Sequence, residues 1–174
     1  MIIFQKLWDN HPTITGDDNP CNTNGKSNFP NQCAIKLGVC LAKNGVNTTK
    51  IPGVTHCWHQ KKSEGHVIRA EELAKGLKRF HLPGVQKVQE VAPESYFREL
   101  KGKTGIIFFK DYWQRTINGT QEEFRNRSGD HIDLWNGSRL TDWKTWVRVR
   151  LNIIIPGVWS DLRKSKSIWF WRIL

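Results

Sequence analysis

Phe29-Pro30-Asn31-Gln32-Cys33-Ala34-Ile35-Lys36-Leu37 is the stretch in which a polar, Gly- and Asn-rich loop turns into a predicted helix. Asn31 is a suitable N-cap, and Gly45 is suited to end the helix. Cys33 then falls in the first turn, where unpaired backbone N–H groups and the helix dipole favour a thiolate over a thiol. This is the environment of a nucleophilic cysteine, although a small buried residue at a helix start would give the same pattern. The apolar face of the helix is formed by Ala34, Leu37, Cys40 and Leu41.

A second stretch lies far downstream and reads Ser128-Gly129-Asp130-His131-Ile132-Asp133-Leu134-Trp135-Asn136-Gly137. Its period-two alternation predicts a strand with His131, Asp133 and Trp135 on one face. Asn136-Gly137 predicts a two-residue hairpin loop, after which residues 138–143 return as a strand. A cysteine at a helix start followed by a histidine on a strand is the order of papain-like nucleophilic catalysis. We therefore predict that His131 is the base for Cys33.

Three acids are candidates for orienting His131, and the hairpin register separates them. With a two-residue loop, His131 faces Asp142 on the returning strand, with Cβ atoms ~4.5–5.5 Å apart. Asp142 is therefore the predicted orienting acid, unless it only caps the segment that follows it. Asp133 lies two residues along the same strand and is predicted to line the substrate cleft. Asp130 and Trp135 flank His131 and are further candidates for contacts with the substrate, although either could simply support the fold.

The two stretches together resemble the active-site motifs of a known family, the fourth family of type VI secretion amidase effectors. The similarity extends over residues 28–171, and that family places its catalytic aspartate after the histidine strand at a similar spacing. The chain departs from the family pattern by extra length around residues 116–126, which affects a loop near the predicted cleft. Three further stretches support the resemblance: Gly65-His66-Val67-Ile68-Arg69-Ala70-Glu71-Glu72-Leu73, Gly105-Ile106-Ile107-Phe108-Phe109 and Pro156-Gly157-Val158-Trp159-Ser160-Asp161.

The resemblance implies an α+β, papain-like cysteine peptidase fold in which an N-terminal catalytic helix packs on an antiparallel β-sheet. It also implies a peptidoglycan amidase, a DL-endopeptidase that cuts the peptide stem between γ-D-glutamate and meso-diaminopimelate. Such enzymes are antibacterial toxins, and a cognate immunity protein protects the producing cell. Helices early in the chain and strands later favour the α+β class independently.

Composition limits the alternatives. The chain has 174 residues with no linker or repeat, so we expect a single catalytic domain over residues 1–174. There are 27 Lys and Arg against 16 Asp and Glu, a net charge of +11, so the protein should favour anionic surfaces. The basic residues are scattered and no nucleic-acid motif is present, so we predict no nucleic-acid partner. The alternative reading is a non-catalytic basic module that binds the cell envelope or nucleic acid.

The predicted location follows from what the ends of the chain lack. Residues 1–9 do not form a signal peptide, and no stretch approaches the ~20 apolar residues of a membrane span. These absences predict synthesis in the producer cytoplasm and no membrane insertion, and they agree with what the resemblance implies, namely export by a type VI system and action in the periplasm of a target cell.

The remaining Cys and His residues do not show metal-ligand spacing. His56, Cys57, His59 and His66 cluster in the sequence without a C-x-x-C or H-x-x-x-H pair, so we predict neither a metal nor a cofactor. If Cys33 stays reduced for catalysis, at most one disulfide can form among the other three cysteines. We favour Cys40–Cys57, with three free thiols as the alternative.

The rest of the chain gives a coarse secondary structure. Amphipathic or short helices are predicted over residues 4–8, 68–80 and 93–100. A continuous apolar run predicts a central strand over residues 105–109. Further strands are predicted over residues 85–91, 147–155 and 167–173.

Overall fold

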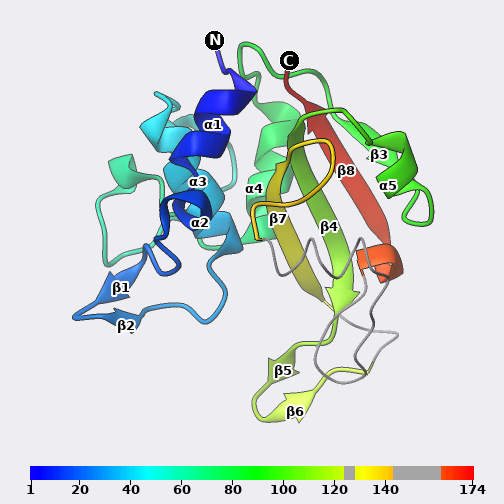
Figure 1. Ribbon diagram of the computed structural model, residues 1–174. Coiled ribbons are helices and arrows are strands. Elements are labelled where there is room, and N and C mark those ends of the chain that lie inside the picture. Colours follow the sequence, from blue (N-terminus) through cyan, green and yellow to red (C-terminus); the bar gives the residue numbers. More distant parts are fainter. Residues whose placement is uncertain (124–127, 143–161) are drawn as a thin grey trace.

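The computed structural model describes residues 1–123, 128–142 and 162–174. Within these residues, helices and an antiparallel sheet form the α+β architecture that the sequence predicts (Figure 1). The α-helices are α1 (Phe4–Asn10), α2 (Pro12–Thr15), α3 (Cys33–Lys43), α4 (Ala70–Arg79) and α5 (Tyr96–Glu99). The 3-10 turns are η1 (Thr48–Lys50), η2 (Lys62–Glu64) and η4 (Leu162–Lys164). The strands are β1 (Asn22–Thr23), β2 (Lys26–Ser27), β3 (Gln89–Val91), β4 (Gly105–Trp113), β5 (Thr116–Ile117), β6 (Thr120–Gln121), β7 (Gly129–Trp135) and β8 (Ser167–Arg172).

The main sheet has the strand order β3-β8-β4-β7, and every pairing in it is antiparallel. β4 lies between β8 and β7, so the prediction of a central strand is confirmed. β7 lies at one edge of the described sheet, and α3 packs against it. The catalytic helix predicted from the sequence therefore meets the strand that carries His131.

The sheet divides the apolar side chains into two cores, because successive residues of a strand point to opposite faces. Ile106 and Phe108 of β4 belong to the larger core, which also takes side chains from α1, α3 and α4. Ile107 and Phe109 belong to the second core, which takes Tyr96 of α5. Figure 1 shows the same arrangement, with α3 and α4 on one side of the sheet and α5 on the other. The continuous apolar run in β4 thus reflects burial on both faces.

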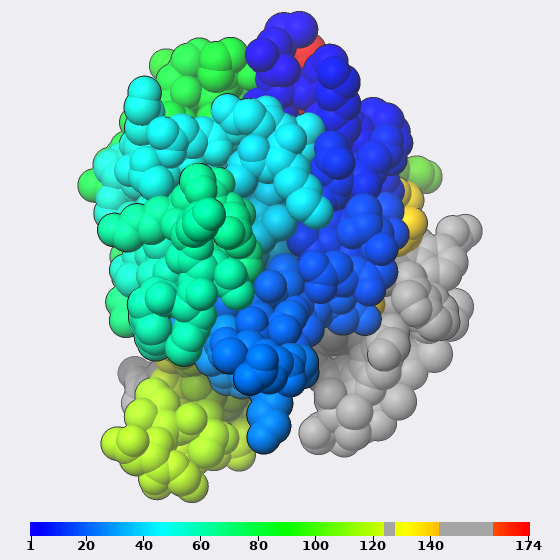
Figure 2. All heavy atoms as spheres, turned by 90° about the vertical axis from the view of Figure 1, so that its left-hand side faces the viewer, coloured from blue at the N-terminus to red at the C-terminus, as the bar shows by residue number. Residues whose placement is uncertain are grey.

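Segments from the N-terminal half of the chain, coloured blue to blue-green in Figure 2, cover the side of the sheet on which α3 and α4 lie. A close approach of two backbones holds α3 there: a Cβ on Gly38 would meet the carbonyl oxygen of Gly65 at 2.0 Å. Gly65 itself has φ = +81°, which disfavours any other residue. We infer that these two glycines allow the segment before Val67 to lie directly on the helix.

Several local predictions are confirmed and others are refined. The helices predicted over residues 4–8 and 68–80 appear as α1 and α4, and the strand predicted over residues 167–173 appears as β8. Of the strand predicted over residues 85–91, only β3 is formed, and the helix predicted over residues 93–100 is confined to α5. The predicted strand over residues 147–155 lies outside the described residues. No helix in the described ranges is long and apolar enough to cross a membrane.

Candidate active site

Cys33 is the first residue of α3, as the sequence predicts, and its side chain is partly exposed. The side-chain oxygen of Asn31 accepts the backbone N–H of Cys33 at 3.2 Å. Asn31 therefore caps the start of the helix, although the position just before the helix is Gln32. This hydrogen bond occupies the N–H group that a helix-start nucleophile would otherwise offer to an oxyanion.

The loop before Cys33 is folded around the buried side chain of Gln32. Its Oε1 accepts the backbone N–H of Cys21 at 2.9 Å, and its Nε2 donates to the carbonyl of Cys21 at 2.9 Å. The same Nε2 donates to Ser27 Oγ at 2.7 Å and to the side chain of Asn19. The amide is thus fully engaged, and it fixes the backbone immediately before the thiol.

His131 lies on β7 and lines the same cavity as Cys33. Burial on its own would lower the pKa of His131, but the carboxylate of Asp133 and a hydrogen bond with Cys33 raise that pKa well above the usual 6.5. The ring stacks beside Phe109, with centroids 6.4 Å apart. Because Nε2 of the ring faces Asp133, Nδ1 is the nitrogen left for the sulfur.

Asp133 is the polar centre of the site, with only 3% of its surface exposed. One carboxylate oxygen lies 3.6 Å from Nε2 of His131, and the other lies 3.6 Å from Nε2 of His11. Thr141 donates its hydroxyl at 2.6 Å and its backbone N–H at 3.2 Å, and the N–H of Leu134 donates at 2.7 Å. Burial alone would raise the pKa of Asp133, but the contact with His131 lowers it below the usual 3.8. The site therefore holds a buried carboxylate beside an imidazolium.

Two cavities meet at Cys33. The larger, of about 640 Å³, is also lined by His131, Asp133, Asp142 and His11. The smaller, of about 330 Å³, is also lined by Asp130, Glu71, Glu72, Arg69 and Arg115. A peptide bound across the thiol could therefore extend in both directions.

The three predicted substrate-contacting residues have different surroundings. Asp133 lines the larger cavity, but the hydrogen bonds described above engage its carboxylate. Asp130 lines the smaller cavity and accepts the backbone N–H of Asp111 at 2.9 Å, and burial raises the pKa of Asp130 to about 6. Trp135 does not reach the described cavities at Cys33. It is fully buried in the second core, and its indole N–H donates to the carbonyl of Leu100 at 2.9 Å. This placement gives Trp135 a structural contact rather than the predicted contact with substrate.

The predicted hairpin register is wrong. Trp135 pairs with Leu140 rather than with Ser138, and the N–H of Asn136 donates to the carbonyl of Arg139 at 3.1 Å. The loop is therefore two residues longer than predicted. Beyond this single bridge, residues 141 and 142 form a bend rather than the predicted returning strand, so the predicted pairing of His131 with Asp142 is not formed. Asp142 still lines the larger cavity, so its catalytic role stays a prediction that no longer rests on the register.

Residues that the sequence did not single out complete the site. His11 is 2% exposed, and its Nδ1 accepts the N–H of Thr13 at 3.3 Å while its Nε2 faces Asp133. Burial lowers the pKa of His11 to about 4, so the ring is neutral at pH 7. His11 is separated from Asp133 by most of the chain, and no local pattern connects the two. Thr141 could have been found only from the correct hairpin register.

His11 should make the stability of the protein depend on pH. In the unfolded chain its pKa is near 6.5 and in the folded protein about 4, so the unfolded chain binds more protons between these values. The contribution is fully present above pH 6.5 and is lost as the pH falls towards 4. We expect wild-type protein to lose up to about 3 kcal/mol more of its unfolding free energy than a His11→Gln variant between pH 7 and pH 4.

Urea unfolding at both pH values measures this difference, and His81→Gln, on an exposed loop, is the matched control. Equal pH dependence of wild-type and His11→Gln protein would contradict a neutral, buried His11.

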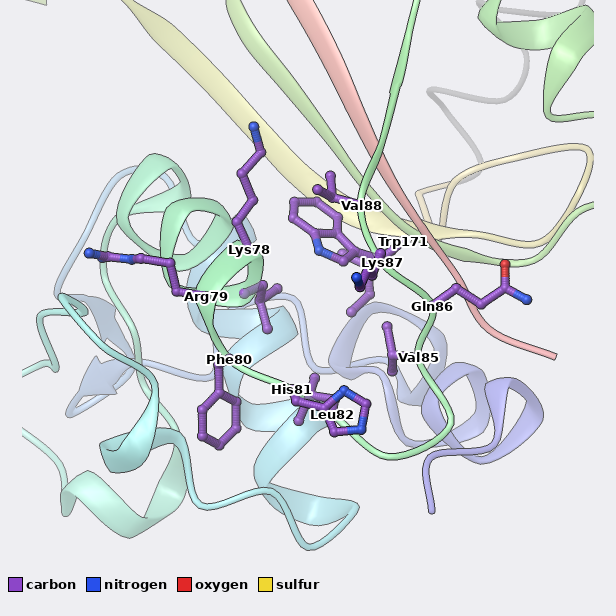
Figure 3. A pocket seen from close by; sticks show the side chains of 12 residues that line it. Lys78, Arg79, Phe80, His81, Leu82, Val85, Gln86, Lys87, Val88 and Trp171 are labelled. Carbon is purple, nitrogen blue, oxygen red and sulfur yellow. The ribbon is translucent and has the colours of Figure 1, made fainter.

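Another cavity, of about 340 Å³, lies between α4, the chain that follows it and Trp171 of β8 (Figure 3). The labelled side chains of Lys78, Arg79 and Phe80 point in different directions rather than converging on a shared centre. It contains no pair of nucleophile and base, so we place the chemistry at Cys33.

A comparison with protein families gives one match over most of the chain. A family model described as "Type VI secretion system (T6SS), amidase effector protein 4" matches residues 29–171, a range that contains Cys33, His131 and both Asp133 and Asp142. A comparison with curated proteins gives no match.

Proposed function

This chain belongs to the type VI secretion amidase effector protein 4 family, and we propose that it is a cysteine amidase that cuts the peptide stem of peptidoglycan. The observation that carries the mechanism is that Cys33 and His131 line one cavity, while Nε2 of His131 faces the buried carboxylate of Asp133. A protonated histidine beside the sulfur is the partner that a thiolate nucleophile needs.

The proposed reaction passes through a thioester. The sulfur of Cys33 attacks the carbonyl carbon of the stem amide, and the imidazolium of His131 gives its proton to the leaving amine. A water molecule then attacks the thioester, with His131 accepting its proton, and the thiol is released. The backbone N–H of Cys33 is a candidate donor for the oxyanion, but it already donates to the side chain of Asn31, so the oxyanion would have to replace that side chain.

Two carboxylates are candidates for the third position of the site. The described contacts support Asp133, which lies 3.6 Å from Nε2 of His131. The family resemblance supports Asp142, which lines the same cavity. We propose that Asp133 orients the ring, because a carboxylate that contacts the far ring nitrogen fixes the tautomer and stabilises the imidazolium.

For the substrate, we propose the amide between γ-D-glutamate and meso-diaminopimelate. The smaller cavity offers carboxylates, including Asp130, near basic side chains, including Arg115. Diaminopimelate carries both an ammonium and a carboxylate, so a cavity with groups of both signs suits it. Asp130, with its pKa raised to about 6, would bind the ammonium best above that pH.

The biological setting is that of an injected toxin. We propose that the chain is exported by a type VI system into a rival cell and acts on its periplasmic peptidoglycan. The net charge of +11 favours an anionic envelope, and it also favours an acidic immunity protein over the active site.

The competing function is a non-catalytic, basic binding module, and thiol alkylation separates the two. We expect iodoacetamide to label Cys33 first, because the other three cysteines are buried, and the loss of peptidoglycan digestion to follow labelling of Cys33 in proportion. Trypsin places the four cysteines in separate peptides, with Cys33 in residues 27–36, so mass spectrometry can measure each one. Full digestion by protein labelled completely at Cys33 would exclude the cysteine mechanism.

A further inference from the structure

Two cysteines outside the proposed catalytic machinery lie side by side. The sulfur atoms of Cys21 and Cys57 are 3.1 Å apart, although the residues are 36 positions apart in the sequence. Their exposed fractions are 0% and 2%. The predicted Cys40–Cys57 pair is not formed, because the thiol of Cys40 donates to the carbonyl of Leu7 at 3.0 Å instead. The fold thus selects one partner for Cys57.

We infer that Cys21 and Cys57 form a disulfide when the protein reaches an oxidising compartment, and that this bond locks the loop that positions Cys33. The compartment follows from the proposed function, since the periplasm is oxidising whereas the cytoplasm of the producer keeps thiols reduced. The bond would be absent while the toxin is stored and present where it acts.

The pair connects two segments that pack on the outer side of the catalytic helix. Cys21 and Cys57 form a small apolar cluster with Ile35 and Val39, both on α3. Cys57 is anchored by its backbone N–H, which donates to the carbonyl of His66 at 2.8 Å. A bond between the two sulfurs would therefore join the loop before α3 to the segment after it.

The coupling to the active site runs through Gln32. Both backbone polar groups of Cys21 are hydrogen-bonded to the Gln32 side chain, and Gln32 directly precedes Cys33. When Cys21 moves, Gln32 loses these two partners, and the backbone that carries the nucleophile is released. A covalent link to Cys57 would prevent this movement.

The oxidation needs an acceptor, and a protein or small-molecule disulfide supplies it. One thiolate attacks the acceptor and forms a mixed disulfide with release of one thiol, and the second thiolate then displaces the other thiol. Two protons and two electrons leave the pair in total. Burial and the neighbouring thiol of Cys57 raise the pKa of Cys21 to about 11, so exchange requires the loop to open, as it does during folding. Once closed, the buried bond is shielded from reducing thiols.

Zinc is the competing occupant, because His66 brings a third donor atom, and the three lie within 4.8 Å of one another. The spacing of the two sulfurs favours the disulfide. Sulfurs that ligate one tetrahedral zinc lie roughly 3.8 Å apart at Zn–S ≈ 2.3 Å, and these are closer.

The test compares the full chain refolded in a glutathione redox buffer containing zinc with the same protein reduced by dithiothreitol. Without reduction, tryptic peptides 7–26 and 51–61 should appear as one cross-linked species, while peptides 27–36 and 37–43 carry free thiols. The oxidised protein should melt about 5–15 °C higher than the reduced protein. Cys57→Ser should abolish this redox-dependent difference, and the matched control Cys40→Ser should keep it.

The possible outcomes are separable. A cross-linked peptide pair with the expected change in Tm supports the inference. Free thiols at both positions, a different pairing, or stoichiometric zinc in the refolded protein would overturn it. Peptidoglycan digestion by the same samples is an independent readout. If protein without the cross-link still digests peptidoglycan, only the inferred disulfide is wrong. If cross-linked protein digests nothing, the proposed function is wrong.

Discussion

Cys33→Ala protein is expected to digest purified peptidoglycan at least about 10³-fold more slowly than the wild type, at the background rate. The substitution removes the only atom that the mechanism allows to attack the stem amide, and His131 alone cannot form the thioester. Initial rates of release of soluble muropeptides measure the effect. Because Cys33 lies at the partly exposed start of α3, the fold should survive, and an unchanged circular dichroism spectrum would show this.

Cys40→Ser is the matched control for this experiment. Cys40 lies on the same helix but is buried, and its thiol donates to the carbonyl of Leu7 rather than contacting either cavity. A serine hydroxyl can make the same hydrogen bond, so we expect near-normal kcat. Wild-type rates for folded Cys33→Ala protein would contradict the assignment of the nucleophile.

Asp133→Asn is expected to lower kcat by roughly 10²- to 10⁴-fold. The neutral amide stabilises an imidazolium less than a carboxylate does, and its NH₂ group can donate to Nε2 of His131, which would fix the wrong tautomer. Asp142→Asn should have a smaller effect, because the carboxylate that lies 3.6 Å from Nε2 of His131 is that of Asp133. Steady-state kinetics of both variants with peptidoglycan fragments, beside their thermal melting curves, give the comparison.

The pH profile separates a role in orienting His131 from a purely structural role. The pKa of His131 is raised partly by Asp133, so removing this carboxylate lowers that pKa, and the alkaline limb of the kcat profile should move to lower pH. A variant that is merely less stable would keep the limb in place. A near-normal kcat for Asp133→Asn together with a large loss of kcat for Asp142→Asn would show that Asp142 orients His131, as the sequence resemblance implies.

The sequence was informative where a local pattern matched a local structure. The helix at Cys33 was predictable because the cap, the apolar spacing and the terminal glycine all lie within a few turns of one another. The buried strand at Gly105–Trp113 was predictable because a short apolar run between turns has few alternatives. The antiparallel α+β class followed from the order of the elements.

The hairpin register was not predictable from Asn136-Gly137 alone. The side-chain oxygen of Asn136 accepts the N–H groups of Ser138 and Arg139 at 3.1 and 2.9 Å, which stabilises a longer loop than the predicted turn. The carbonyl of Gly137 also accepts the N–H of Gly102 at 2.9 Å, a contact with a distant segment. A tertiary contact and a side-chain cap thus outweighed the local turn preference.

The assignment of Trp135 failed for a different reason. The alternation of side chains along a strand predicts which residues share a face of the sheet, but it does not predict which part of that face other elements cover. α5 covers the end of β7, where Tyr96 and Phe97 pack against the indole at centroid distances of 6.1 and 5.7 Å. His11 was missed because its partner, Asp133, lies far away in the sequence.

Mass spectrometry of muropeptides tests the central claim most directly. Peptidoglycan from a meso-diaminopimelate species is incubated with wild-type or Cys33→Ala protein, and the products are separated and sequenced. We expect wild-type protein alone to cut stems between γ-D-glutamate and meso-diaminopimelate and to leave the glycan strands intact. Cut glycan strands, uncut stems, or the same stem products from Cys33→Ala protein would contradict it.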